Sequence, residues 1–292
     1  MIVKRGQVSR ILKMNTFLET NGRLPIYRTI NTISHIVEFI SSRNIPIDQI
    51  LDGSGITVKE LRDPDKRIKT EQELKILRKI RELSREPEIG LILGQQYHIG
   101  VHGNLGIAAM FSNTALEALD LMMRYAELTL TFFQYELTVN GDMACMKAKE
   151  LIDLHDLRRM ICEREFASIY RMCGDVIGKP LELHEVHLAY PEPEYPALYK
   201  EYLNCRVNFN AKDHMFVFKA KQLYMALPKA NRLMKKKHEE ECHRLYMRLK
   251  ELESVVDKIY NELLFYEEGQ VPMVKIAGQM NISTRTLRRH LD

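Results

Sequence analysis

The stretch that decides the organisation of this sequence reads Pro272-Met-Val-Lys-Ile-Ala-Gly-Gln-Met-Asn-Ile-Ser-Thr-Arg-Thr-Leu-Arg-Arg-His-Leu291. Its first part predicts a helix, because proline suits the first helical position and apolar residues recur from Met273 at helical spacing. Asn281 tolerates the left-handed backbone conformation that a tight turn requires. We therefore expect this helix to end at Asn281.

A second short helix is expected directly after this turn. Ser283 is a strong N-cap, and Leu287 and Leu291 are four residues apart, so they share one inward face. Arginine binds guanine or phosphate, and hydroxyl groups bind phosphate. The pattern predicts a helix-turn-helix that reads DNA with its second helix, and the alternative is a helical hairpin with a solvated arginine face. The expected DNA-binding residues are Ser283, Thr284, Arg285, Thr286, Arg288 and Arg289.

This segment resembles the first helix-turn-helix of AraC family regulators. The family pattern has an apolar residue followed by alanine, a short turn, and then Ser-x-Arg-x-Leu-x-Arg-x-Leu. Ile276-Ala277 opens the pattern here. Its later positions are Ser283, Arg285, Leu287, Arg289 and Leu291.

A second resemblance lies upstream, in the run from Gly103 to Leu119 with Arg124-Tyr125. It is similar to the AraC subgroup that carries the arabinose-binding N-terminal domain, as in ornithine-utilisation-type regulators. The segment 204–209 also looks like later strands of that domain. Together the two resemblances cover roughly residues 30–292.

The resemblance implies a bacterial transcription regulator without a cofactor. Its expected partners are double-stranded operator DNA, a small-molecule effector, a second copy of the chain in a homodimer, and RNA polymerase. AraC DNA-binding regions hold two helix-turn-helix units joined by a long helix. Only the first is present here, so we expect the sequence to stop inside that region, at Asp292.

Ahead of the helix-turn-helix, residues 229–270 predict a helical linker. Its leucine, valine and isoleucine residues recur at alternating spacings of four and three, which is a heptad pattern. One interpretation is a dimerising helix, and the other is an amphipathic helix packed on its own domain. The seam consists of Leu245, Leu249, Leu252, Val256, Ile259 and Leu263.

Residues 29–228 predict an α+β regulatory domain that senses a ligand, preceded by a loosely ordered N-terminal arm over 1–28. Helical patterns fill 29–125, and Thr57 with Glu60, Thr70 with Glu73 and Thr114 with Glu117 have capping-box spacing. Asn140-Gly141 predicts a hairpin of strands over 132–149. A helix over 156–177 and a strand over 181–189 follow, and then a second hairpin that pairs 207–209 with 215–219.

An effector pocket is expected among the aromatic residues of this domain, although core packing is the alternative use for them. The candidates are Phe132, Phe133, Tyr135 and Tyr170.

Charge and composition favour a nucleic-acid binder in the cytoplasm. The net charge is +4, and both ends of the chain are basic around an acidic middle. The five cysteines are widely spaced, which indicates reduced thiols rather than a disulfide framework. No apolar run reaches the ~20 residues that a membrane helix needs, and the basic N-terminus lacks the apolar core of a secretory signal.

We expect neither a metal site nor an enzyme. His184 and His187 are three residues apart on a predicted strand, so they point to opposite faces. The run from His238 to His243 offers two ligands on one helix face, without a third. The glycine-rich run 100–106, with His98 and His102 nearby, is interpreted as a turn before a helix. No nucleophile lies in a recognisable catalytic pattern, so the alternative to a DNA-binding regulator is a protein–protein interaction module.

Overall fold

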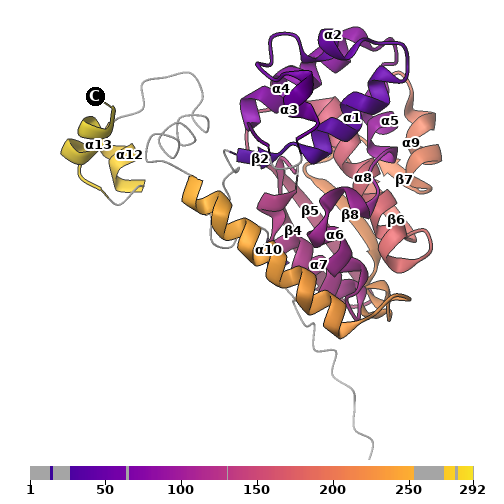
Figure 1. Ribbon diagram of the computed structural model, residues 1–292. Coiled ribbons are helices and arrows are strands. Elements are labelled where there is room, and N and C mark those ends of the chain that lie inside the picture. Colours follow the sequence, from indigo (N-terminus) through magenta and orange to yellow (C-terminus); the bar gives the residue numbers. More distant parts are fainter. Residues whose placement is uncertain are drawn as a thin grey trace, which may run out of the picture.

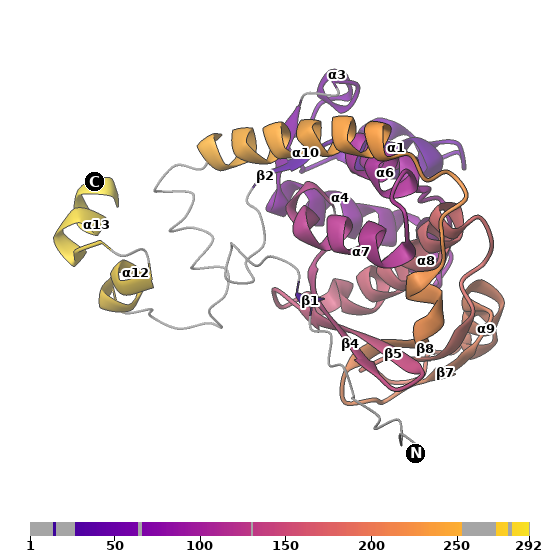
Figure 2. The same ribbon diagram turned by 90° about the horizontal axis from the view of Figure 1, so that it is seen from below.

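The structure is a computed structural model, and it describes residues 14–15, 27–63, 66–129, 131–252, 273–279 and 282–291. Helices and one large sheet form the body, and α10 lies along its outside (Figure 1). Figure 2 shows the sheet on one side of this body and α10 on the opposite side, with α7 between them. The α+β class expected from the sequence is confirmed. No helix among the described residues is long and apolar enough to cross a membrane.

The N-terminal third is mainly helical, because its apolar residues recur at helical spacing and face one shared core. Thr57 forms the predicted capping box with Glu60, whereas α4 begins at Thr70 itself, so the predicted Thr70–Glu73 cap is wrong. The elements are β2 (Tyr27–Thr29), α1 (Asn31–Ser41), α2 (Ile47–Leu51), α3 (Val58–Leu61), β3 (Arg67–Lys69), α4 (Thr70–Leu83) and α5 (Ile89–Gln95).

The glycine-rich run forms a short helix and a turn, as expected. Gly103 has a φ of +53°, and Gly106 lies so close to Ile99 that any side chain would collide with its carbonyl oxygen. Thr114 caps α7 by accepting a hydrogen bond from the Glu117 amide at 3.2 Å. The elements are the 3-10 helix η1 (Ile99–His102), α6 (Asn104–Met110), α7 (Ala115–Arg124) and the 3-10 helix η2 (Ala126–Leu128).

The large sheet has six strands in the order β1-β4-β5-β8-β6-β7. The predicted hairpin at Asn140-Gly141 is confirmed, because β4 and β5 pair antiparallel and Gly141 takes a φ of +59° between them. The strands are β1 (Met14–Asn15), β4 (Phe133–Asn140), β5 (Met143–Glu150), β6 (Leu183–His187), β7 (Arg206–Asn208) and β8 (His214–Lys219).

The second predicted hairpin is wrong. β7 does not pair with β8 but lies parallel to β6, and β8 pairs antiparallel with both β5 and β6. The helix α9 (Pro196–Leu203) connects β6 to β7, which is the crossover that parallel neighbours require. The apolar residues of β8 suit a central strand, and the short β7 suits the edge.

Part of the N-terminal arm belongs to the sheets. Met14 pairs with Leu137 at the β1 edge, and Tyr27 pairs with Lys69 in the small β2–β3 sheet. The expectation of a loosely ordered arm therefore fails for these residues. Main-chain pairing at a sheet edge needs no particular side-chain pattern, so this pairing could not be predicted from the residues.

The long helix α8 (Arg158–Ile177) occupies the centre of the body. Phe166 stacks on Phe216 of β8, with ring centroids 4.2 Å apart, so one face of α8 packs on the sheet. Its other side receives α5, whose Gly90 and Gly94 let the two backbones approach closely. A 3-10 turn, η3 (His155–Leu157), precedes α8, and another, η4 (Ala220–Tyr224), follows β8.

The helix α10 (Arg232–Leu252) packs against α6, and it also contacts α7. Leu249 is buried in this contact and Leu245 is partly buried beside it, so these two seam residues face the helix's own domain. Leu252 ends the described part of the seam, and Val256, Ile259 and Leu263 lie outside the described residues. Burial of Leu249 favours the interpretation of the described part as an amphipathic helix packed on its own domain.

Two further short helices, α12 (Met273–Gln279) and α13 (Thr284–Leu291), form the predicted pair near residue 291. Ile276, Ala277 and Leu287 are buried together between them. The small Ala277 side chain lets the two helices approach, as the sequence pattern predicts.

Candidate functional site

A cavity of about 170 Å³, partly open to solvent, lies within the body of the protein. Its lining is mostly apolar and comes from α7, α8 and the strands β4, β5 and β8. Concave and largely apolar sites with a few polar groups are the usual places for small-molecule binding. The cavity is therefore the candidate ligand site of this domain.

One face of α8 lines this cavity along most of the helix. The lining begins with Arg164 and Glu165 and recurs at every turn down to Val176 and Ile177. Ile177 lies thirteen positions after Arg164, which at 1.5 Å per residue corresponds to roughly 20 Å. The cavity therefore follows the helix as an elongated space.

Polar groups gather at the Arg164 end of this space. Tyr135 of β4 donates a hydrogen bond to Oε1 of Glu165 at 2.5 Å. The hydroxyl of Thr131 lies 3.4 Å from the Tyr135 oxygen. Burial, with the Glu165 charge, holds the pKa of Tyr135 well above its usual range, so this phenol stays protonated and remains a donor.

The charged groups behind this polar end are paired. Arg28 of β2 donates to Glu73 of α4 at 3.1 Å, and Arg164 lies 3.5 Å from the other oxygen of the same carboxylate. All three side chains are buried. With Glu165 they form a group of two arginines and two carboxylates whose formal charges cancel.

No sequence pattern indicated this charged group, because Glu73 follows Thr70 at capping-box spacing and was expected to serve as a helix cap. Arg28 precedes the first helix by a few residues, and no local sequence pattern indicates that it has a buried partner. Arg28 also lies over the ring of Phe132, with its guanidinium carbon 4.3 Å from the ring centroid. The Phe132 ring therefore packs against the guanidinium of Arg28.

Two buried polar atoms of the cavity lining have no hydrogen-bond partner: Oη of Tyr97 and Nδ1 of His102. Burial raises the pKa of Tyr97 to about 12, against a smaller opposing effect of the Arg164 charge. Burial lowers the pKa of His102 to about 4, so the imidazole is neutral at physiological pH. Unsatisfied buried polar atoms are rare in proteins, and a ligand is one way to satisfy them.

Of the four aromatic residues predicted to form an effector pocket, Tyr135 lines the cavity. Phe132 and Phe133 are fully buried in the core instead, and Tyr170 is partly buried against it. The sequence patterns did not single out α8, because its mixture of polar and apolar residues is also that of an ordinary amphipathic helix.

The helix α7 has one side on the cavity and another on α10. Leu119 and Met123 line the cavity, whereas Leu121 is buried against α10. Two ion pairs fix this second contact: Arg124 to Glu239 at 2.7 Å, and Glu117 to Lys235 within ordinary hydrogen-bonding distance. The helix α7 therefore contacts both the cavity and α10.

The helix α6 makes further contacts with α10. Nδ1 of His238 lies 2.8 Å from the side-chain oxygen of Asn104, and the His238 ring stacks on Phe111 at 6.4 Å. Cys242, one turn further on, is fully buried in the same contact. His238 and Cys242, weighed in the sequence as metal ligands, thus serve to dock the helix.

The predicted DNA-binding residues lie on the second helix of the pair. Ser283 accepts a hydrogen bond from the Thr286 amide at 3.1 Å and so caps α13 as expected. Arg285 and Arg288 are exposed, and Thr284 and Thr286 are half-buried. The Arg289 side chain lies outside the described part of the chain. The exposed arginines and the capped helix start form a polar surface opposite Leu287.

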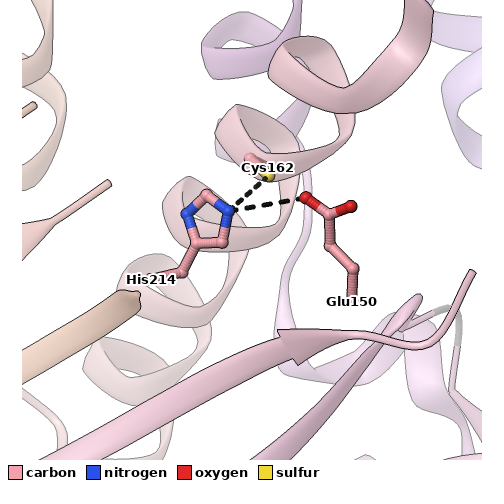
Figure 3. A group of neighbouring side chains, drawn as sticks. All are labelled: Glu150, Cys162 and His214. Atoms are coloured by element: carbon pink, nitrogen blue, oxygen red, sulfur yellow. Dashed lines mark hydrogen bonds and ion pairs between the residues drawn. The ribbon is translucent and has the colours of Figure 1, made fainter. Parts of the chain in front are cut away.

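Among the described residues, one group has the composition of a metal site: Glu150, Cys162 and His214 (Figure 3). Nε2 of His214 lies 3.5 Å from Glu150 Oε1 and 3.7 Å from Cys162 Sγ. However, the Ala189 amide donates to Nδ1 of the same ring at 3.2 Å, so a neutral His214 carries its proton on Nε2.

Metal binding through Nε2 would need a free lone pair there. The proton would move to Nδ1, where it would face the Ala189 N–H, and two donors would oppose each other. The group instead provides an Nε2–H that points toward a carboxylate and a sulfur atom (Figure 3). The arrangement is that of a buried hydrogen-bonded cluster.

Comparison with known proteins places this chain in a family. Residues 45–227 match the model of the arabinose-binding domain of AraC transcription regulators, N-terminal. The chain belongs to this family of AraC-type transcriptional regulators, and the matched segment contains the elements that line the cavity.

Individual relatives agree with this assignment. The chain is 24% identical to the ornithine utilization regulator of Pseudomonas aeruginosa, over 88% of this chain and 76% of that protein. It is 25% identical to an uncharacterized HTH-type transcriptional regulator of Mycobacterium tuberculosis, over 92% of this chain and 78% of the relative. The first relative is named as a regulator and the second as a transcriptional regulator.

A solved structure supports the fold. The transcriptional regulator CdpR from Pseudomonas aeruginosa superposes with a TM-score of 0.50 at 20% sequence identity, over 74% of this chain and 70% of that one. This likeness concerns the fold, and it agrees with the α+β body followed by helices.

Proposed function

We propose that this AraC-type regulator binds operator DNA through α12 and α13, and that an effector in the cavity controls this binding. The observation that carries the DNA-binding part is the capped α13, which is anchored by Leu287 and exposes Arg285 and Arg288. In helix-turn-helix proteins the N-terminal residues of the second helix contact base edges. Arg285 and Arg288 therefore have the chemistry and the position to reach bases or phosphates.

The effector part rests on the cavity and on the position of α7. A ligand that displaces Leu119 or Met123 would move the helix that holds α10 through Glu117 and Arg124. Because α10 leads toward the DNA-binding helices in the sequence, a shift of its docking would change how they are presented. The cytoplasm is the expected compartment, and a homodimer and RNA polymerase remain the expected partners from the family resemblance.

The DNA-binding test uses the protein expressed from its complete natural reading frame. Arg285→Ala and Arg288→Ala are each expected to weaken operator binding by about 1–3 kcal/mol for a base contact. Arg206→Ala, which removes an exposed arginine from β7, serves as the matched control and is expected to leave operator affinity unchanged.

Salt dependence separates DNA binding from a protein–protein module. Loss of a phosphate contact is expected to reduce the slope of log affinity against log salt by about one. Operator affinity that is the same in the two variants, the control and the unaltered protein would contradict the proposal.

A further inference from the structure

We propose that the cavity binds an elongated amphipathic molecule, with an uncharged hydrogen-bonding head at the Tyr97 and Arg164 end and an apolar chain that extends along α8 toward Ile177. This inference rests on the proposed function only in that the molecule would be the effector. The shape, the distribution of polar groups and the balance of charge in the cavity carry it.

The elongated shape comes from three walls that run side by side. On α8 the lining extends from Arg164 to Ile177, and on the sheet it extends from Tyr135 to Phe218. Tyr135 lies in the same cross-strand row as His214, and Phe218 lies four residues further along β8. The sheet wall therefore advances in the same direction as the α8 wall.

The third wall belongs to α7, which runs in the opposite direction. It is followed by Ala126 of η2, which leads to Thr131 and the polar end, and its start at Ala115 packs with Val176 and Ile177. The residues that line the cavity extend along roughly 20 Å of α8. A chain fits such a space better than a compact ring system.

The two ends of the cavity differ in chemistry. The far end is formed by an apolar cluster that includes Ala118, Val176, Ile177 and Leu181. The near end holds the hydroxyl groups of Tyr97, Thr131 and Tyr135 with the neighbouring charged side chains. A ligand with one polar head and one apolar tail matches this division.

The head is expected to be uncharged because the charged groups already balance one another. Arg28 and Arg164 face Glu73 and Glu165, so a charged head would enter a buried site without a counter-ion of its own. The unsatisfied Oη of Tyr97 can both donate to and accept from a neutral oxygen or amide. An alcohol or a primary amide has the required chemistry.

The apolar chain of the ligand is tested by isothermal titration calorimetry of this protein with hexanol, octanol and decanol at neutral pH. Affinity is expected to rise by up to about fourfold for each added methylene while the chain still lies inside the cavity, which corresponds to about 0.8 kcal/mol. Affinity that does not depend on chain length, or the absence of binding by every alcohol, would overturn the inference.

The charge of the head is tested with octanoate and octylammonium against octanol. Both ions are expected to bind at least tenfold more weakly, because burial of an unpaired charge is costly. Tighter binding of octanoate would assign the head to the Arg164 guanidinium and overturn the uncharged head.

Two variants locate the ligand. Tyr97→Phe removes the buried hydroxyl beside Arg164, and octanol is expected to bind this variant about two- to tenfold more weakly. Ala118→Leu fills the apolar end and is expected to weaken the binding of decanol more than the binding of hexanol. Ala197→Leu, an exposed alanine of α9, is the matched control and is expected to change neither.

The outcomes separate this inference from the proposed function. Loss of all alcohol binding in a protein that still binds operator DNA overturns the ligand class and leaves the regulator intact. Alcohol binding that follows chain length without any effect on operator affinity supports the ligand class and contradicts the effector role.

Discussion

Gly94 of α5 and Ala167 of α8 lie so close that a Cβ atom added to Gly94 would be 2.5 Å from the Cβ of Ala167 and 2.6 Å from the Arg164 carbonyl oxygen. Contacts this short do not occur between real side chains, so the glycine is required by the packing of the two helices. This packing holds the α8 backbone at Arg164 and Ala167, beside the polar end of the cavity.

Gly94→Ala is therefore expected to destabilise the protein by about 1–3 kcal/mol, because overpacking forces the helices apart. Urea denaturation followed by circular dichroism measures this change. Gly100→Ala is the control, since a Cβ there meets nothing within 4 Å and φ is not positive. Equal stabilities of the two variants would contradict the close approach.

The buried charged group predicts a recovery of stability in a double variant. Arg28→Met leaves Arg164 as the ion-pair partner of Glu73 and is expected to cost about 3–5 kcal/mol of stability. Adding Glu73→Gln removes the carboxylate charge and should recover part of that loss. If the loss of stability in the double variant equals the sum of the losses in the two single variants, the Arg28–Glu73 pair does not behave as a coupled unit.

Glu163 predicts a pH dependence. Burial raises the pKa of this carboxyl to about 7, against hydrogen bonds from Tyr199 and Tyr195 and the Arg159 charge, which lower it. The folded protein thus holds a proton that the unfolded chain releases near its ordinary pKa of 4.5. The resulting stability is present below pH 4.5 and is lost as the pH rises to 7, by on the order of 1 kcal/mol per unit.

The neutral His102 has the opposite effect on the pH dependence of stability. Its pKa is lowered to about 4, so its contribution is present above pH 6.5 and is lost as the pH falls toward 4. Glu163→Gln removes the loss of stability at high pH. Between pH 4.5 and 6.5 the melting temperature of this variant is therefore expected to rise with pH relative to that of the unaltered protein. Identical pH profiles for the two proteins would rule out a raised pKa at Glu163.

The docking of α10 predicts a charge-reversal rescue. Glu117→Lys places a like charge opposite Lys235 and is expected to increase amide hydrogen exchange in α10. The second change, Lys235→Glu, restores opposite charges and should return the exchange toward its original rate. The size of the coupling is expected to be about 0.5 kcal/mol and to decrease at high salt. Rescue that fails at low salt would show that apolar contacts alone hold the helix.

The regular elements could largely be predicted from the sequence. Alternating residues and Asn140-Gly141 identified the β4–β5 hairpin, and the spacing around Ala277 identified the pair α12 and α13. The partner of β7 could not be predicted, because strand order depends on where α9 carries the chain and not on the residues of the strand itself.

The candidate site was less predictable. Tyr135 was found by its aromatic neighbourhood, but Arg164 and Glu73 meet across 91 positions of sequence, and no local spacing reports such a pair. Aromatic residues such as Phe132 are large enough to serve equally well as core or as lining. Only the three-dimensional arrangement separates these two uses.

The position of α7 between the cavity and α10 has a consequence for the evolution of the protein. Under the proposed function, substitutions on the α8 wall, at positions such as Met172, are expected to alter which effector is recognised and to leave the output machinery unchanged. Substitutions in α7 would disturb recognition and output together, and a genetic selection should recover them as constitutive or unresponsive alleles. Lineages could thus acquire new inducers through drift in one helix, while purifying selection holds its neighbour nearly fixed.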